Sequence, residues 1–128
     1  MMDLAEKNLS YIDLARTLKD KRDFCLARLY NADFTKFNFT DVNLTEANLY
    51  NTNLTEAYLS KANLTKTQLT KADFTKSNLA SANLTEAKII DTKIISANLS
   101  EANLTRANLA ASNLTESNLA KANLQEAK

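Results

Sequence analysis

The 128-residue chain contains no glycine, proline, histidine or tryptophan, and its only cysteine is Cys25. Histidine is the usual general base and a frequent metal ligand, and Cys25 has no histidine to activate it as a nucleophile. A glycine-rich phosphate-binding loop cannot form without glycine. A single cysteine makes no intrachain disulfide, which fits a reducing compartment. We therefore expect a cytoplasmic protein that is not an enzyme and holds no metal or cofactor.

Charge and hydropathy exclude two further kinds of partner. The 16 basic and 15 acidic residues give a net charge of +1, and the two signs alternate along the chain instead of forming a basic stripe, so nucleic acid is not an expected partner. The start, MMDLAEKNLSYIDLARTLKDK, has no apolar run long enough for a signal peptide or a membrane span. The expected partner is a protein of unknown identity.

What the sequence does contain is a period of five. From Phe24 to Leu124 every fifth residue, the centre of a unit, is Leu, Phe or Ile at all 21 positions. Asn or Asp precedes the centre in 16 of the 21 units, and Ala, Ser or Thr stands two residues before it in 18. A step of five spirals around an α-helix and changes face on a strand, so neither element buries these side chains together. A chain that turns a corner in every unit does bury them, and four such corners close a 20-residue coil.

The motif Ala-Asn-Leu-Thr-x, as in Ala102 to Arg106, resembles the pentapeptide-repeat proteins over residues 22–126. The resemblance implies an all-β solenoid, a right-handed quadrilateral β-helix of about five 20-residue coils. The family often has Gly at the fifth position, and this chain has none. Because positive φ is costly for Glu and Lys, we expect corners of mostly negative φ, closer to type I than to type II turns.

Charged residues give an independent test of the 20-residue coil. Residues 20 apart should be vertical neighbours in the stack. Among the residues two after each centre, nine vertical pairs have both members charged, and all nine pairs are opposite in sign. Adjacent strands avoid like charges, so this pattern supports the register.

The two ends depart from the regular pattern. Residues 1–21 are expected to form an N-terminal cap, and residues 22–128 the β-helix. A capping box from Ser10 and Asp13 favours a short helix from about Tyr11 to Asp20, while the spacing of Leu4, Leu9 and Leu14 favours a partial coil instead. At the other end only QEAK follows Leu124. The resemblance implies a dimer through the C-terminal coil, and a polar end on a monomer is the alternative.

The leading functional interpretation is a non-catalytic structural scaffold or protein-interaction module. Apolar and basic residues interrupt the outward Asn, Thr, Glu and Lys, and they form a candidate docking surface on two adjacent faces. Its residues are Tyr30, Tyr50, Tyr58, Lys88, Ile90, Lys93 and Ile95. The simpler alternative is that such residues merely suit a strand surface. The resemblance also suggests a second function, mimicry of DNA in binding to DNA gyrase, although the net charge of +1 disfavours it.

Overall fold

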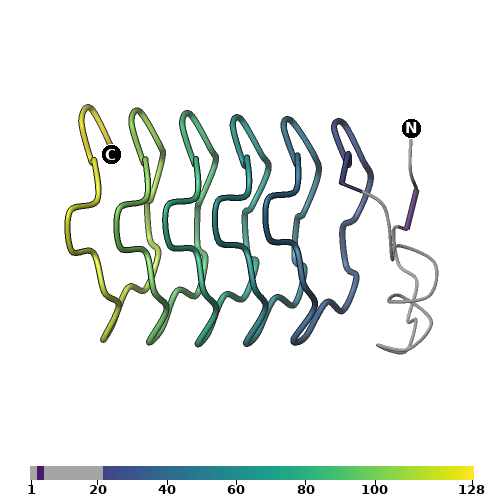
Figure 1. The fold of residues 1–128 in the computed structure, drawn as a ribbon, viewed down its shortest axis with the longest axis horizontal. Coiled ribbons are helices and arrows are strands. Elements are labelled where there is room, and N and C mark those ends of the chain that lie inside the picture. The colour runs from purple at the N-terminus through teal and green to yellow at the C-terminus, as the bar shows by residue number, and fades with distance from the viewer. Residues whose placement is uncertain (1–2, 5–21) are drawn as a thin grey trace.

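The fold is a stack of coils in register, and Figure 1 shows the stack from the side. The computed structural model describes residues 3–4 and 22–128. Within these ranges the chain forms no helix and no extended strand. Successive coils meet at isolated parallel bridges between residues 20 apart, from Asp23↔Asn43 through to Asn103↔Asn123. The 20-residue coil deduced from the period of five is therefore confirmed.

Each coil has four sides, which we name by their bridge residues. Side A contains Asp23, Asn43, Asn63, Asn83, Asn103 and Asn123, and side B contains Arg28, Asn48, Gln68, Lys88 and Asn108. Side C contains Asp33, Asn53, Asp73, Lys93 and Asn113, and side D contains Asn38, Tyr58, Asn78, Asn98 and Asn118. The corner between two sides takes both letters, so that Glu46 lies at corner AB, Asn51 at corner BC, Glu56 at corner CD and Lys61 at corner DA.

An interior unit with Asn before its centre uses all five of its backbone N–H groups, as the unit Asn43–Ala47 shows. The N–H groups of residues 43 to 47 donate in turn to Arg22 O, Asn63 O, Asn43 Oδ1, Thr65 O and Leu44 O, at 2.7–3.1 Å. Three of these bonds run to neighbouring coils, one closes the turn, and one goes to the side chain of the unit's own Asn. Buried backbone donors need partners, and this unit provides them without a continuous strand.

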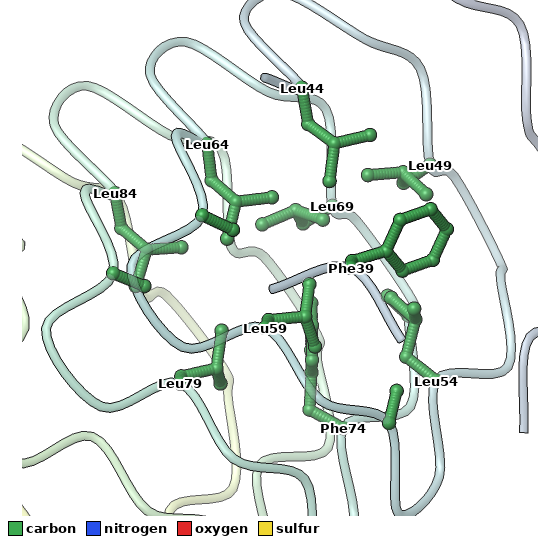
Figure 2. Packing of buried hydrophobic residues seen from close by; sticks show 14 of the residues in the cluster. Phe39, Leu44, Leu49, Leu54, Leu59, Leu64, Leu69, Phe74, Leu79 and Leu84 are labelled. Carbon is green, nitrogen blue, oxygen red and sulfur yellow. The ribbon is translucent and has the colours of Figure 1, made fainter. Parts of the chain in front are cut away.

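The centres and the small residues two before them fill the interior. Leu44, Leu64 and Leu84 stack in one column in Figure 2, and all three are at most 2% exposed. The first full coil carries more aromatic volume. Phe39 packs edge-on against Phe24 and Phe34, with ring centroids 5.6 and 5.1 Å apart. Phe37 takes a position that is small in most other units, 4.7 Å from the Phe39 ring.

The expectation of negative φ at the corners is wrong. Every residue two after a centre, from Leu26 to Glu126, has φ between 52° and 63°, and none is glycine. With negative φ at the preceding residue and a bond such as Ala47 N to Leu44 O, these are turns of the type II class. Positive φ costs a non-glycine residue about 1 kcal/mol or more. Positive φ also directs the N–H of that residue toward a carbonyl of the next coil, as in Glu46 N to Thr65 O at 2.9 Å. This bond recurs along the stack and offsets the local cost.

Ala111 tests this account of the corners, because its φ is 59° and its side chain carries no charge. We expect Ala111→Gly to raise the free energy of unfolding by about 0.5–1 kcal/mol in urea denaturation, since glycine adopts positive φ without a Cβ clash. Ala102→Gly is the matched control. Ala102 is buried and does not have positive φ, so this change should lower stability, and a lower stability for both variants would contradict the account.

The two ends differ in how well the core is covered. Leu4 is buried, and its N–H donates to Arg28 O at 2.8 Å. Asp3 forms a parallel bridge with Arg28. A spacing of 20 residues would pair Asp3 with Asp23, so the observed partner lies one five-residue unit further along the chain. The rest of the expected cap, including the helix Tyr11–Asp20 and the positions of Leu9 and Leu14, lies outside the described residues. In the last coil Leu109, Leu114 and Leu119 are only partly buried, and Leu124 is 43% exposed.

The charged columns form as the sequence predicts. Three of the nine expected pairs lie within ion-pair distance, at 3.7, 3.5 and 3.8 Å: Lys36–Glu56, Arg106–Glu86 and Arg106–Glu126. All are exposed, so each contributes at most about 1 kcal/mol. Their main structural consequence is register, because a slip of one corner would change the partner of every charge.

Candidate interaction site

The residue before each centre decides whether its corner is fully bonded. In all 16 units where this residue is Asn or Asp, its Oδ1 accepts the N–H of the residue after the centre, as in Thr65 N to Asn63 Oδ1 at 3.1 Å. The other fifteen bonds are of the same kind. Five units lack such a side chain, having Arg28, Tyr58, Gln68, Lys88 and Lys93 in its place. Asn or Asp therefore acts as a local cap at each regular corner.

Two of these five corners lose a second bond. Among residues 22–128, the turn bond from the residue three after the centre back to the centre is present at every other corner and absent at those after Ile89 and Ile94. At the first, Thr92 N donates to Ser112 Oγ at 3.2 Å, and the Ser112 hydroxyl donates to Ile89 O. The Ser117 hydroxyl donates to Ile94 O in the same manner. At the first of these corners, a serine from the next coil thus takes the place of the direct turn bond.

We call residues 88–97 the open-corner segment. It contains Lys88, Ile90, Lys93 and Ile95, four of the seven residues that the sequence indicates for docking. Lys88 and Lys93 are exposed, Ile90 and Ile95 are half-buried, and Lys93 Nζ lies 3.7 Å from Asp73 Oδ2. These four side chains run around one coil, across sides B and C and the two corners that follow them.

The three tyrosines lie elsewhere on the rod. Tyr30 and Tyr50 share the column of Ile90, but Thr70 separates them from it. Tyr30 is half-buried, and its hydroxyl accepts a 2.8 Å bond from Arg28 Nη2. Tyr50 is 40% exposed, and Tyr58 on side D is 52% exposed. The structure thus groups the lysines and isoleucines, places Tyr30 and Tyr50 two or more coils away, and puts Tyr58 on a different side.

One backbone consequence of Lys88 and Lys93 cannot be seen in the sequence alone, although a signal for it is present. The sequence shows Lys88 and Lys93 in place of Asn beside the isoleucines, and the consequence for the backbone appears only in the folded coil. Without a side-chain acceptor at the preceding position, Ile90 N and Ile95 N have no hydrogen-bond partner among the described residues. The segment combines apolar side chains with unsatisfied backbone donors at the surface.

Two polar grooves and a column of paired charges lie beside the open-corner segment. Two polar grooves of about 400 and 450 Å³ run along side B beside corner AB and share Glu86 and Lys88. Glu86 lies 3.5 Å from Arg106 in the column that walls both grooves. Within residues 3–4 and 22–128, no three side chains of the metal-binding kinds gather around a common point. The same residues include no helix that could cross a lipid bilayer.

Restoring a missing cap tests the role of the residue before the centre. We expect Lys88→Asn to raise the free energy of unfolding by about 0.5–1.5 kcal/mol, because the new amide oxygen can accept Ile90 N–H. Asn108 lies in the same column and accepts Ala110 N–H at 3.1 Å. Asn108→Lys should therefore lower stability by a similar amount in the same denaturation experiment. Equal effects of the two substitutions would contradict the assigned role.

Comparisons with known proteins agree with this architecture. The family described as pentapeptide repeats matches in eight copies over residues 23–60, 52–89 and 97–128, which leaves out residues 90–96 of the open-corner segment. No curated protein sequence matches the chain. Among solved structures, the chain is similar to the pentapeptide repeat protein Rfr23 from the cyanobacterium Cyanothece 51142. Their identity is 24% over 89% of this chain and 95% of that chain, with a TM-score of 0.71.

Two further likenesses are weaker. A pentapeptide repeat protein from the Arabidopsis thaliana thylakoid lumen is 22% identical over 74% of this chain and 63% of its own, with a TM-score of 0.47. HetL from the cyanobacterium Nostoc is 23% identical over 83% and 73%, with a TM-score of 0.43. The likeness to Rfr23 extends to the fold alone and implies a right-handed quadrilateral β-helix. The family match covers most of the chain, and the chain belongs to the pentapeptide repeat family.

Proposed function

We propose that this protein is a non-catalytic scaffold of the cytoplasm that binds a protein partner through the open-corner segment. One observation carries the proposal: residues 88–97 contain the two described corners that lack both the side-chain cap and the direct turn bond, and two isoleucines and two lysines lie there. A partner would bury the exposed parts of the Ile90 and Ile95 side chains, and the free N–H groups of these residues would gain acceptors. The interior is filled by centre side chains, so binding is confined to the outer surface.

Affinity capture from the native cell with two variants tests this function. We expect Ile90→Ser with Ile95→Ser to lose the partner proteins that the unchanged chain retains. Thr75→Ser with Thr115→Ser is the control, because these residues occupy the column of Ile95 in other coils. Circular dichroism checks that both variants fold. A partner set that is unchanged by the isoleucine substitutions would show that the segment is not the docking site.

The C-terminal coil is a second candidate contact, as a weak dimer interface. The partial exposure of Leu124, Leu119, Leu114 and Leu109 supports such an interface. Sedimentation at micromolar and higher concentrations measures the mass, and Leu124→Asn should weaken a dimer of this kind. A dimer whose dissociation constant is unchanged by Leu124→Asn would exclude the C-terminal coil as the contact.

DNA mimicry remains the alternative function, and the charge distribution gives it little support. Corner AB alternates Glu46, Lys66, Glu86 and Arg106, and the other three corner columns also mix basic and acidic side chains. A mimic of duplex DNA needs a continuous acidic surface. A supercoiling assay with DNA gyrase tests this function directly, and we expect no inhibition by the purified protein.

A further inference from the structure

Side D is the only one of the four sides whose bridge residues carry no charge along the described coils. Four of them are Asn and the fifth is Tyr58, which is 52% exposed. The Asn side chains are joined along the column, with Asn98 Nδ2 and Asn118 Nδ2 each 3.4 Å from the Oδ1 of the Asn one coil before. The middle of side D is thus uncharged, and one aromatic ring protrudes from it.

The two corners that border side D carry opposite charges at the same level of the stack. Each coil places one residue of corner CD and one residue of corner DA at the two edges of side D. The pairs, in chain order, are Lys36 with Asp41, Glu56 with Lys61, Lys76 with Ser81, Ser96 with Glu101, and Glu116 with Lys121. In three of the pairs both residues are charged, and in all three the charges are opposite in sign.

The other three sides do not share this property. On side A the edge pair Asp41 and Glu46 is alike in sign. Lys66 with Lys71 is alike on side B, and Lys71 with Lys76 is alike on side C. The feature is therefore specific to side D and does not follow from the vertical alternation of charge, which holds in every column.

We propose that side D binds a second copy of this chain, side by side and with both chains running in the same direction. A two-fold axis parallel to the solenoid sets corner CD of one copy against corner DA of the other at every level. Glu56 then faces the partner's Lys61, and Lys61 faces the partner's Glu56. Tyr58 meets the partner's Tyr58 in the middle of the interface, among uncharged Asn side chains.

The direction of the second copy follows from the same charges. Two copies running in opposite directions in full register would set each corner column against itself. Lys76 would then face the partner's Lys76 at the middle of corner CD, and like charges opposed at an interface disfavour that arrangement. The opposed arrangement also sets Lys36 against the partner's Glu116, Asp41 against the partner's Lys121 and Lys61 against the partner's Glu101, so it equals the parallel one in opposite pairs. The parallel arrangement contains no like pair, and avoiding the Lys76 contact is what favours it.

The size of the surface fits a weak dimer. The chain exposes 6620 Å² in total, and four sides and two ends share this area. A standard interface buries about 800 Å² of each partner, about one eighth of this surface. The edge charges are exposed ones, and their contribution depends on salt. We expect a dimer that forms at tens to hundreds of micromolar at low salt and dissociates as salt rises.

Charge reversal and complementation test the proposal by sedimentation equilibrium at low salt. Glu56→Lys and Lys61→Glu should each weaken self-association about tenfold or more, because each places like charges together at two symmetric contacts. A mixture of the two variants should recover the affinity, since the reversed residues of one complement those of the other. Lys71→Glu, at corner BC, is the matched control and should leave the affinity unchanged. Circular dichroism of each variant separates loss of pairing from loss of fold.

Several outcomes would overturn the proposal. The chain could stay monomeric at hundreds of micromolar and low salt. A dimer could respond to Lys71→Glu as much as to Lys61→Glu, or the mixed variants could fail to recover. Sensitivity to Leu124→Asn alone would assign the contact to the C-terminal coil. None of these outcomes bears on whether Ile90 and Ile95 dock another protein, so the proposed function stands or falls separately.

Discussion

Deleting Lys66 alone is expected to lower the free energy of unfolding by more than about 5 kcal/mol, or to abolish the cooperative transition. The deletion shortens the step between the centres Leu64 and Leu69 from five to four. A step of four cannot close a corner and keep both centres inside. The coil on one side of the deletion then loses its bonds and its column contacts with the coil on the other side. Urea denaturation followed by circular dichroism measures the effect.

Deleting a whole unit in place of one residue is the control for that experiment. Removal of residues 66–70 joins Thr65 to Lys71 and restores a complete unit, because Lys71, Ala72 and Asp73 repeat the chemistry of the lost positions. The charged columns also stay free of like pairs. We expect a loss of no more than about 3 kcal/mol, since a solenoid tolerates removal of a whole repeat. A larger loss than for the single deletion would contradict the five-residue unit as the structural element.

Leu64→Ala is expected to cost about 2–5 kcal/mol of stability, the range for a large cavity in a packed core. Leu64 is fully buried and lies in a column between Leu44 and Leu84 (Figure 2). The surrounding coils are tied by backbone bonds on every side, so they have little freedom to collapse into the space. Differential scanning calorimetry or urea denaturation checks the value.

The position of a centre along the stack should set the size of this loss. Leu119 belongs to the last coil and is only partly buried, so Leu119→Ala should cost less than half as much as Leu64→Ala. Lys66→Ala, at an exposed corner, should change stability by no more than about 0.5 kcal/mol. Equal losses for Leu64 and Leu119 would mean that the last coil is covered in solution.

The period of the centres is enough to predict the coil length, the inward positions and the vertical neighbours. These properties follow from which side chains leave water, and the sequence states that directly. The backbone conformation at the corners is beyond the same reasoning. Absence of glycine indicates negative φ at residues such as Glu46 and Lys66, because the local cost of positive φ is easy to estimate from a single residue. The compensating bond to the next coil belongs to the assembled stack and cannot be seen in one unit.

The candidate docking residues show the same division. Ile90, Ile95, Lys88 and Lys93 stand out in the sequence because they depart from the repeat, and the structure places them on one coil. Tyr58 departs from the repeat in the same way, but it lies on side D. The loss of the turn bonds after Ile89 and Ile94 accompanies serines of the next coil, which a pattern within one unit does not include. The complementary edges of side D likewise become apparent only when successive corners are placed at one level.

Residues 20 apart are vertical neighbours throughout the stack, and Cys25 allows this register to be tested with one substitution. Thr45 lies directly beyond Cys25 in its column, next to the bridge Asp23↔Asn43. At the spacing of adjacent chains, about 4.8 Å, two cysteines can form a disulfide. We predict that Thr45→Cys forms an intrachain disulfide on mild oxidation, detected by mass spectrometry, and that Thr40→Cys and Tyr50→Cys, one unit before and one unit after Thr45, do not. Equal yields at the three positions, or a preference for position 40 or 50, would contradict the 20-residue coil.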